Sequence, residues 1–208
     1  MLTEYKTLCE GGVGELTEKK SRFIATVIPI ESEDEAIVEL EKIKKKYWDA
    51  RHNCWAYMIG TEQVLERCSD DGEPSGTAGK PILEVIRGEE VHNVLVVVTR
   101  YFGGTLLGTG GLVRAYTGAA KEGLKQSKAV TRVYGYKLRI HTDYTGLGKI
   151  QYILGKMGIP VRRSVYTDTV EIEIFAAEKE KKGLVNEIAE GTNGQARIEN
   201  MGERWMDK

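Results

Sequence analysis

A glycine-rich stretch is the first part of the sequence that offers chemistry, because bare backbone N–H groups can hold an anion. It lies in RYFGGTLLGTGGL, residues 100–112. A phosphate loop of the Walker type needs Lys and then Ser or Thr after its last glycine, where this chain has Thr109 and Gly110. A dinucleotide fingerprint needs a third glycine at the position of Val113. Neither nucleotide loop is therefore predicted.

A strand, a glycine-rich turn and the N-terminus of a helix remain as the interpretation. This arrangement favours an anion through free N–H groups and the helix dipole. On the helix, a period of 3.6 residues gathers basic side chains on one face: Arg114, Lys121, Lys125, Lys128 and Arg132. The predicted anion-binding or nucleic-acid-binding residues are Arg100, Gly103, Gly104, Gly108, Gly110, Gly111, Arg114, Lys121 and Lys125. The alternative is a merely solvated basic face, with glycines that allow tight packing.

The acidic loop DDGEPSGTAGKP, residues 70–81, is the second candidate site. Its carboxylates are weak candidates for magnesium ligands: Asp70, Asp71 and Glu73. Asp-Gly and Glu-Pro pairs are also typical of hydrogen-bonded turns, and this is the favoured interpretation. Lys80 and Arg100 are candidates to neutralise the carboxylates as ion pairs, which would remove charge offered to a ligand. No metal or cofactor is predicted.

Nucleophile motifs give little support for catalysis. The sequence has no G-x-S-x-G motif, and Ser69 and Ser75 have no marked partner. His52 and Cys54 lie two residues apart on an expected strand and would share a face, which occurs in many proteins without chemistry. The sequence therefore favours a protein without catalytic activity.

Composition limits the classes of partner. The chain has 208 residues and a formal net charge of −1, so attraction of a nucleic acid must come from a local patch. The longest apolar run, VLVVV at 94–98, is far shorter than the ~20 residues of a membrane helix. Three cysteines argue against a disulfide framework. We expect a cytoplasmic protein without a membrane partner.

Hydrophobic periodicity predicts two α+β domains, residues 1–132 and 133–208. The first is expected to contain a hairpin with its turn at residues 11–14, a helix at 33–47 and a buried strand at 93–102. The second reads strand, helix, two strands, helix, strand, which is the ferredoxin-like βαββαβ order. No flexible linker separates the two.

Four motifs resemble the IMPACT/YigZ family: KKSRFIA at 19–25, HNCWAY at 52–57, DDGEPSGTAGKPIL at 70–83 and RYFGGTLLGTGGLVRAY at 100–116. The resemblance, to the bacterial two-domain members, implies a first domain like the ribosomal protein S5 domain 2-like α/β sandwich, also seen in the fourth domain of elongation factor G. It implies a second domain like the ferredoxin-like fifth domain of that factor. Eukaryotic members regulate translation through a ribosome-associated activator of a stress kinase, a partner that we do not transfer to this chain.

The leading hypothesis is a cytoplasmic, translation-associated regulator that binds RNA, the ribosome or translation components. One alternative is a phosphotransferase or hydrolase that combines the glycine turn with magnesium on the acidic loop. Another is a protein-interaction module that uses the open face of the ferredoxin-like sheet. The sequence leaves the cognate partner and the oligomeric state open.

Overall fold

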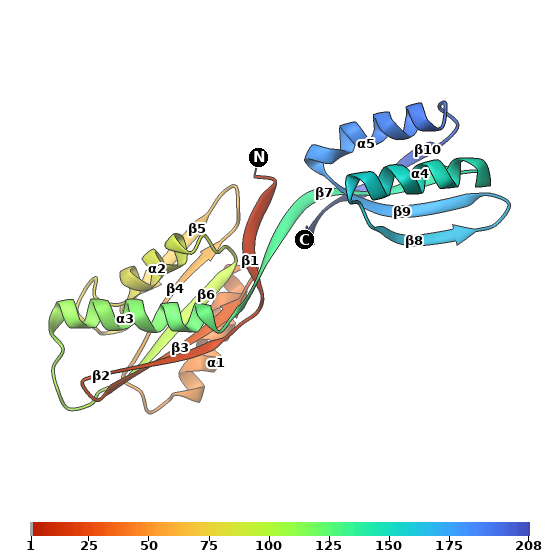
Figure 1. Ribbon diagram of the computed structural model, residues 1–208. Coiled ribbons are helices and arrows are strands. Elements are labelled where there is room, and N and C mark those ends of the chain that lie inside the picture. Colours follow the sequence, from red (N-terminus) through yellow and green to blue (C-terminus); the bar gives the residue numbers. More distant parts are fainter. Residues whose placement is uncertain (1) are drawn as a thin grey trace. The chain divides into compact units, whose positions relative to one another are not determined.

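The protein folds into two compact units, seen in a computed structural model that describes residues 2–208 (Figure 1). The units are Met1–Thr131 and Arg132–Lys208. The division falls inside a strand, β7 (Lys128–Thr142). Among residues 2–208, helices long and apolar enough to cross a membrane are absent.

The first unit is built around a five-stranded antiparallel sheet with the order β2-β3-β6-β4-β5. The strands are β2 (Val13–Glu18), β3 (Ser21–Pro29), β4 (His52–Ile59), β5 (Leu65–Ser69) and β6 (Val94–Tyr101). β6 is central, and its first seven residues are buried. Both of its faces are covered, which explains why its sequence is a continuous apolar run instead of an alternating one.

Helices cover both faces of this sheet: α1 (Glu33–Lys46) lies on one side, and α2 (Gly79–Gly88) and α3 (Gly108–Lys125) lie on the other (Figure 1). Alternate residues of β6 pack toward the two sides, with Val96 against α2 and α3 and Leu95 against α1. α1 begins as expected, because the Ser32 hydroxyl accepts a hydrogen bond from the Glu35 N–H. The result is an α+β sandwich.

The expected hairpin at the N-terminus is wrong. β1 (Glu4–Glu10) does not pair with the next strand but neighbours β7, where the Cys9 thiol donates to the Lys128 carbonyl oxygen. The hairpin joins β2 and β3 instead. Its turn is Lys19–Lys20, and both residues have positive φ angles, 45° and 67°. The sequence hides this turn because lysine is not a usual residue in the left-handed region.

The second unit has the ferredoxin-like order β10-β7-β9-β8, with β9 between β7 and β8. Its other elements are α4 (Tyr144–Met157), β8 (Val161–Tyr166), β9 (Val170–Ala177), α5 (Glu178–Gly191) and β10 (Arg197–Asp207). Ile172 and Ile174 of β9 are buried in the core with α4 and α5, and they alternate with Glu171 and Glu173. β7 begins at Lys128, ahead of the domain boundary expected at residue 133, and β10 ends at Asp207.

Candidate functional site

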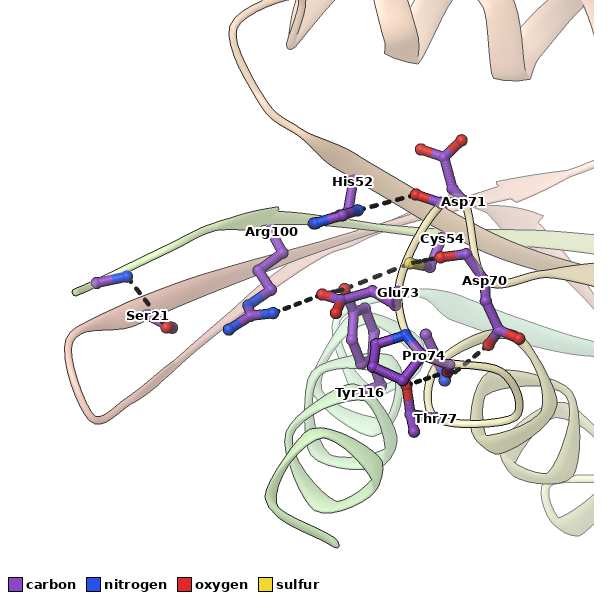
Figure 2. A network of polar contacts seen from close by, with 12 residues as sticks. Ser21, His52, Cys54, Asp70, Asp71, Glu73, Pro74, Thr77, Arg100 and Tyr116 are labelled. Carbon is purple, nitrogen blue, oxygen red and sulfur yellow. Dashed lines mark hydrogen bonds and ion pairs between the residues drawn. The ribbon is translucent and has the colours of Figure 1, made fainter. Parts of the chain in front are cut away.

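A buried polar network centred on Glu73 joins the acidic loop to both flanks of the glycine-rich turn (Figure 2). Glu73 Oε1 accepts a hydrogen bond from Arg100 Nη1 at 2.6 Å and another from the Tyr116 hydroxyl at 2.8 Å. Arg100 is the last residue but one of β6, ahead of the turn, and Tyr116 lies on α3, after it. The loop therefore fixes the strand and the helix between which the glycines lie.

Asp70 organises the rest of the loop by capping α2. Its carboxylate accepts three backbone N–H bonds, from Gly76 at 2.8 Å, Ala78 at 2.9 Å and Gly79 at 2.8 Å. Burial alone would raise the pKa of the Asp70 carboxyl, but the three donors outweigh it and hold the pKa below its usual value. An ionised carboxylate at the N-terminus of a helix is also favoured by the helix dipole.

The remaining loop contacts involve β4. Asp71 accepts a hydrogen bond from the Asn53 N–H at 2.6 Å, and its carbonyl oxygen lies 2.9 Å from His52 Nδ1. The Cys54 thiol donates to the Asp70 carbonyl oxygen at 2.9 Å. Burial raises the pKa of Cys54 to about 12, so its reactive thiolate form is disfavoured. The structure gives no support to a catalytic pair of Cys54 and His52.

The three carboxylates considered as weak magnesium ligands therefore accept hydrogen bonds from groups of the protein itself. Asp70 holds the start of α2, Asp71 holds β4, and Glu73 holds Arg100 and Tyr116. Among residues 2–208, His, Cys, Asp and Glu side chains form no cluster of three or more placed to hold a metal ion. These contacts are those of the hydrogen-bonded turn, and Arg100 is the cation that neutralises Glu73.

Gly103 must be glycine because another segment of backbone lies too close to leave room for a side chain. A Cβ atom at this position would lie 2.0 Å from the carbonyl carbon of Lys20, in the β2–β3 turn. The Gly103 N–H donates to the Ser21 hydroxyl at 3.1 Å. The backbone that approaches this glycine is therefore the protein's own hairpin.

Gly108 and Gly110, at the start of α3, are exposed and have open space around them. Gly108 has a φ of +70°, which favours glycine at the entry to the helix, and Gly104 is also left-handed at +86°. α3 begins at Gly108 without a side-chain cap. A Cβ atom on Gly110 would meet only Arg114 Nη1, at 3.7 Å. The first N–H groups of any helix have no acceptor within the helix, so this end retains donors.

α3 separates an apolar from a basic face, as its sequence indicates. The buried residues are Gly111, Leu112, Ala115, Tyr116, Ala119, Ala120 and Gly123. Arg114, Lys121 and Lys125 are exposed and fall in one row over about 16 Å of helix. Lys125 lies 3.9 Å from Glu122, whereas Arg114 and Lys121 form no ion pair within residues 2–208. We call Arg114, Lys121 and Lys125 the α3 basic row.

Two expected members of the stripe lie elsewhere. Lys128 and Arg132 belong to β7, because α3 ends at Lys125. Arg100 is buried and 7% exposed, so it lies within the Glu73 network and not on the basic row. Sequence reasoning missed the hydroxyls of Tyr116 and Ser21 as contacts of this region. Helical phase indicates that Tyr116 is buried, but no local pattern identifies an acceptor 43 residues away.

Comparison with known proteins agrees with this architecture. The Impact N-terminal domain matches residues 19–124, and a domain of unknown function (DUF1949) matches residues 140–195. IMPACT family member YvyE of Bacillus subtilis (strain 168) is 40% identical over 208 residues, which are 100% of this chain and 96% of that protein. IMPACT family member YigZ of Escherichia coli (strain K12) is 32% identical over 182 residues, covering 86% of this chain and 89% of YigZ.

One solved structure, titled as the crystal structure of a hypothetical protein, covers 97% of this chain and 99% of its own. Its TM-score is 0.61 and its sequence identity is 29%. The matched Impact N-terminal domain contains both the acidic loop and the glycine-rich turn. The protein therefore belongs to the IMPACT/YigZ family.

Proposed function

We propose that this protein takes part in the regulation of translation and that it binds RNA through the α3 basic row. In the cell, this RNA is ribosomal RNA. The observation that carries the proposal is the row itself: Arg114 and Lys121 are exposed and without ion pairs in residues 2–208, and the row starts at an uncapped glycine-rich helix end. Cationic side chains and helix N-termini are the usual contacts of RNA phosphates. The resemblance to family members that regulate translation supports a role in translation.

The overall charge makes this a local interaction. With a net charge of −1, the chain as a whole does not attract a polyanion. The groove beside Lys121 is lined by Glu84 and Glu89, from α2 and the residue that follows it, and by Lys80, so charges of both signs lie next to the row. Three phosphate contacts predict that the logarithm of the affinity falls with the logarithm of salt concentration with a slope of about −2 to −3.

The test is binding of purified ribosomes and ribosomal RNA at several salt concentrations. Reversal of two charges, Arg114→Glu with Lys121→Glu, is expected to abolish binding. The matched control is Lys45→Glu with Lys46→Glu on exposed positions of α1, which changes the net charge equally. Equal binding by the two double variants would reject the basic row as the site, and no binding by the natural sequence would reject the RNA function.

A second variant tests the helix end without altering charge. Gly110→Ala adds a methyl group where the structure is open and where α-helix is already formed, so stability should be kept or raised. If phosphate oxygens approach the N–H groups of this turn, the methyl group obstructs them and weakens RNA binding. Unchanged RNA affinity would limit the site to the side chains of the row.

A further inference from the structure

A pocket of about 560 Å³ opens on the β6 flank of the glycine-rich turn. Its lining residues are different from those of the α3 basic row. It is formed by the start of β4, by Asp49 and Arg51 ahead of that strand, by the end of β6, and by the loop that follows β6. We call it the Arg100 pocket. Its volume lies within the range of about 300–1,000 Å³ that small-molecule sites occupy.

The main feature of the pocket is a buried arginine with unused donors. Arg100 gives one hydrogen bond, from Nη1 to Glu73, although a guanidinium carries five N–H groups. Its Nε atom is fully buried and has no hydrogen-bond partner within residues 2–208. Figure 2 shows another guanidinium nitrogen turned away from Glu73. Because Nε is covered by protein atoms, the Nη2 group is the one left to donate to an oxygen of a phosphate or carboxylate.

A second arginine lines the same pocket. Arg51 is exposed, and no residue among 2–208 forms an ion pair with it. His52 also lines the pocket, and its Nδ1–H donates to the Asp71 carbonyl oxygen, which can only accept. The one carboxylate of the lining, Asp49, accepts a hydrogen bond from the Tyr101 hydroxyl at 2.7 Å. Because Arg100 is already paired with Glu73, the groups that can hold an anion here are the Arg51 guanidinium and the unused Nη2 donors of Arg100.

The remaining wall is apolar and exposed. Phe102 is 53% exposed, and its ring centroid lies 5.6 Å from the Arg100 guanidinium carbon. Leu106 is 83% exposed in the glycine-rich stretch. A half-exposed aromatic ring beside a set of phosphate-binding cations is the arrangement that receives a nucleobase.

We propose that the Arg100 pocket binds a nucleotide, with its phosphate monoester on the Nη2 group of Arg100 and on Arg51, and its base against Phe102. The phosphate is chosen over a carboxylate because two cationic side chains face one small anion. A free mononucleotide and the 5′-phosphorylated end of an RNA carry this same chemistry.

The experiment is calorimetric titration of the full chain at low ionic strength with AMP, inorganic phosphate, adenosine and acetate. We expect AMP to bind more tightly than phosphate and at least about tenfold more tightly than adenosine, because a charge-assisted pair of hydrogen bonds is lost without the phosphate. Absence of AMP binding overturns the proposal. Acetate bound as tightly as phosphate overturns the assignment of the anion.

Two exposed substitutions locate the ligand while Arg100 is kept, since its removal would strand Glu73. Arg51→Gln should weaken AMP and phosphate alike, whereas Phe102→Ala should weaken AMP by about tenfold and leave phosphate unchanged. The matched controls are Arg162→Gln and Tyr152→Ala, at exposed positions of the second unit. AMP affinity unchanged in both pocket variants overturns the placement.

Two further experiments identify the source of the phosphate and distinguish this proposal from RNA binding by the α3 basic row. A 5′-phosphorylated oligoribonucleotide that competes with AMP better than its 5′-hydroxyl form supports an RNA end as ligand, and competition by mononucleotides alone supports a free nucleotide. The Arg114→Glu and Lys121→Glu variant should bind AMP normally. Loss of AMP binding in that variant would place the nucleotide on α3 and overturn the pocket.

Discussion

The Arg100 guanidinium donates to the Glu73 carboxylate at 2.6 Å, and the two side chains are only 8% and 4% exposed. These residues come from the central strand and from the acidic loop, and Tyr116 of α3 donates to the same carboxylate oxygen. A charge pair removed from water is kept only when its geometry is good and other hydrogen bonds support it. This contact therefore fixes the position of the glycine-rich turn.

Glu73→Gln should destabilise the first unit strongly. The amide keeps the shape of the carboxylate but removes its charge, so the buried cation of Arg100 is left uncompensated, at a cost of about 3–5 kcal/mol in unfolding free energy. Urea denaturation measures the loss. Glu84→Gln, which breaks an exposed pair with Arg87 at 2.7 Å, is the control and should cost under about 1 kcal/mol. Similar losses in the two variants would contradict a dominant role for the buried pair.

Two glycine-to-alanine substitutions in the same stretch should have opposite effects. Gly103→Ala places a methyl group 2.0 Å from the Lys20 backbone, so the β2–β3 turn must move and stability must fall. Gly110→Ala has open space and lies in a helix, where alanine is favoured by about 1 kcal/mol. Thermal unfolding followed by circular dichroism distinguishes them. Equal melting temperatures for the two variants would show that the Lys20 contact is not maintained in solution.

Asp70 should make stability depend on pH at the acid end. Because its folded pKa is lower than its unfolded pKa, its contribution is complete above the usual carboxyl range, about pH 4, and is lost as pH falls through the folded value. Asp70→Asn turns an amide toward one of the backbone donors and should cost about 1–3 kcal/mol at pH 7. Unfolding free energies from pH 7 to pH 3 should therefore converge for the two proteins. Parallel curves would contradict this assignment.

Thiol labelling should separate the three cysteines. Cys9 and Cys68 are exposed, whereas Cys54 is fully buried and has a pKa raised to about 12. Iodoacetamide at pH 8 should modify the first two in the native protein, and Cys54 only after denaturation. Mass spectrometry of digested protein counts the modified sites. Rapid native labelling of Cys54 would show an accessible thiolate and revive a nucleophilic role.

Periodicity was enough for most of the fold because it records burial directly. The alternation around Ile172, the capping spacing of Ser32 and Glu35, and the apolar run of β6 all predict elements that the structure contains. The prediction of a hairpin with its turn at residues 11–14 was wrong for a physical reason. The turn of the observed β2–β3 hairpin uses Lys19 and Lys20 in the left-handed region, where tertiary packing on Gly103 holds them against their own preference.

Only those features of the candidate site that depend on neighbouring residues in the sequence could be predicted. The open helix start at Gly108 and the exposed residues Arg114 and Lys121 follow from composition and helical phase. The partner of Arg100 does not, because Glu73 lies 27 residues away and the sequence offered both burial with a carboxylate and exposure to a ligand. Which of these two holds for Arg100 depends on how the acidic loop folds over the sheet.

The order of strands in the first unit has a consequence for synthesis on the ribosome. All five strands of the β2-β3-β6-β4-β5 sheet precede residue 102, whereas α3, which covers one side with α2, ends only at Lys125. A nascent chain that has released β6 but not α3 displays Phe23 and Val98 to water. Chaperones that hold emerging chains should therefore meet this protein in a narrow window, which closes as Tyr116 leaves the exit tunnel.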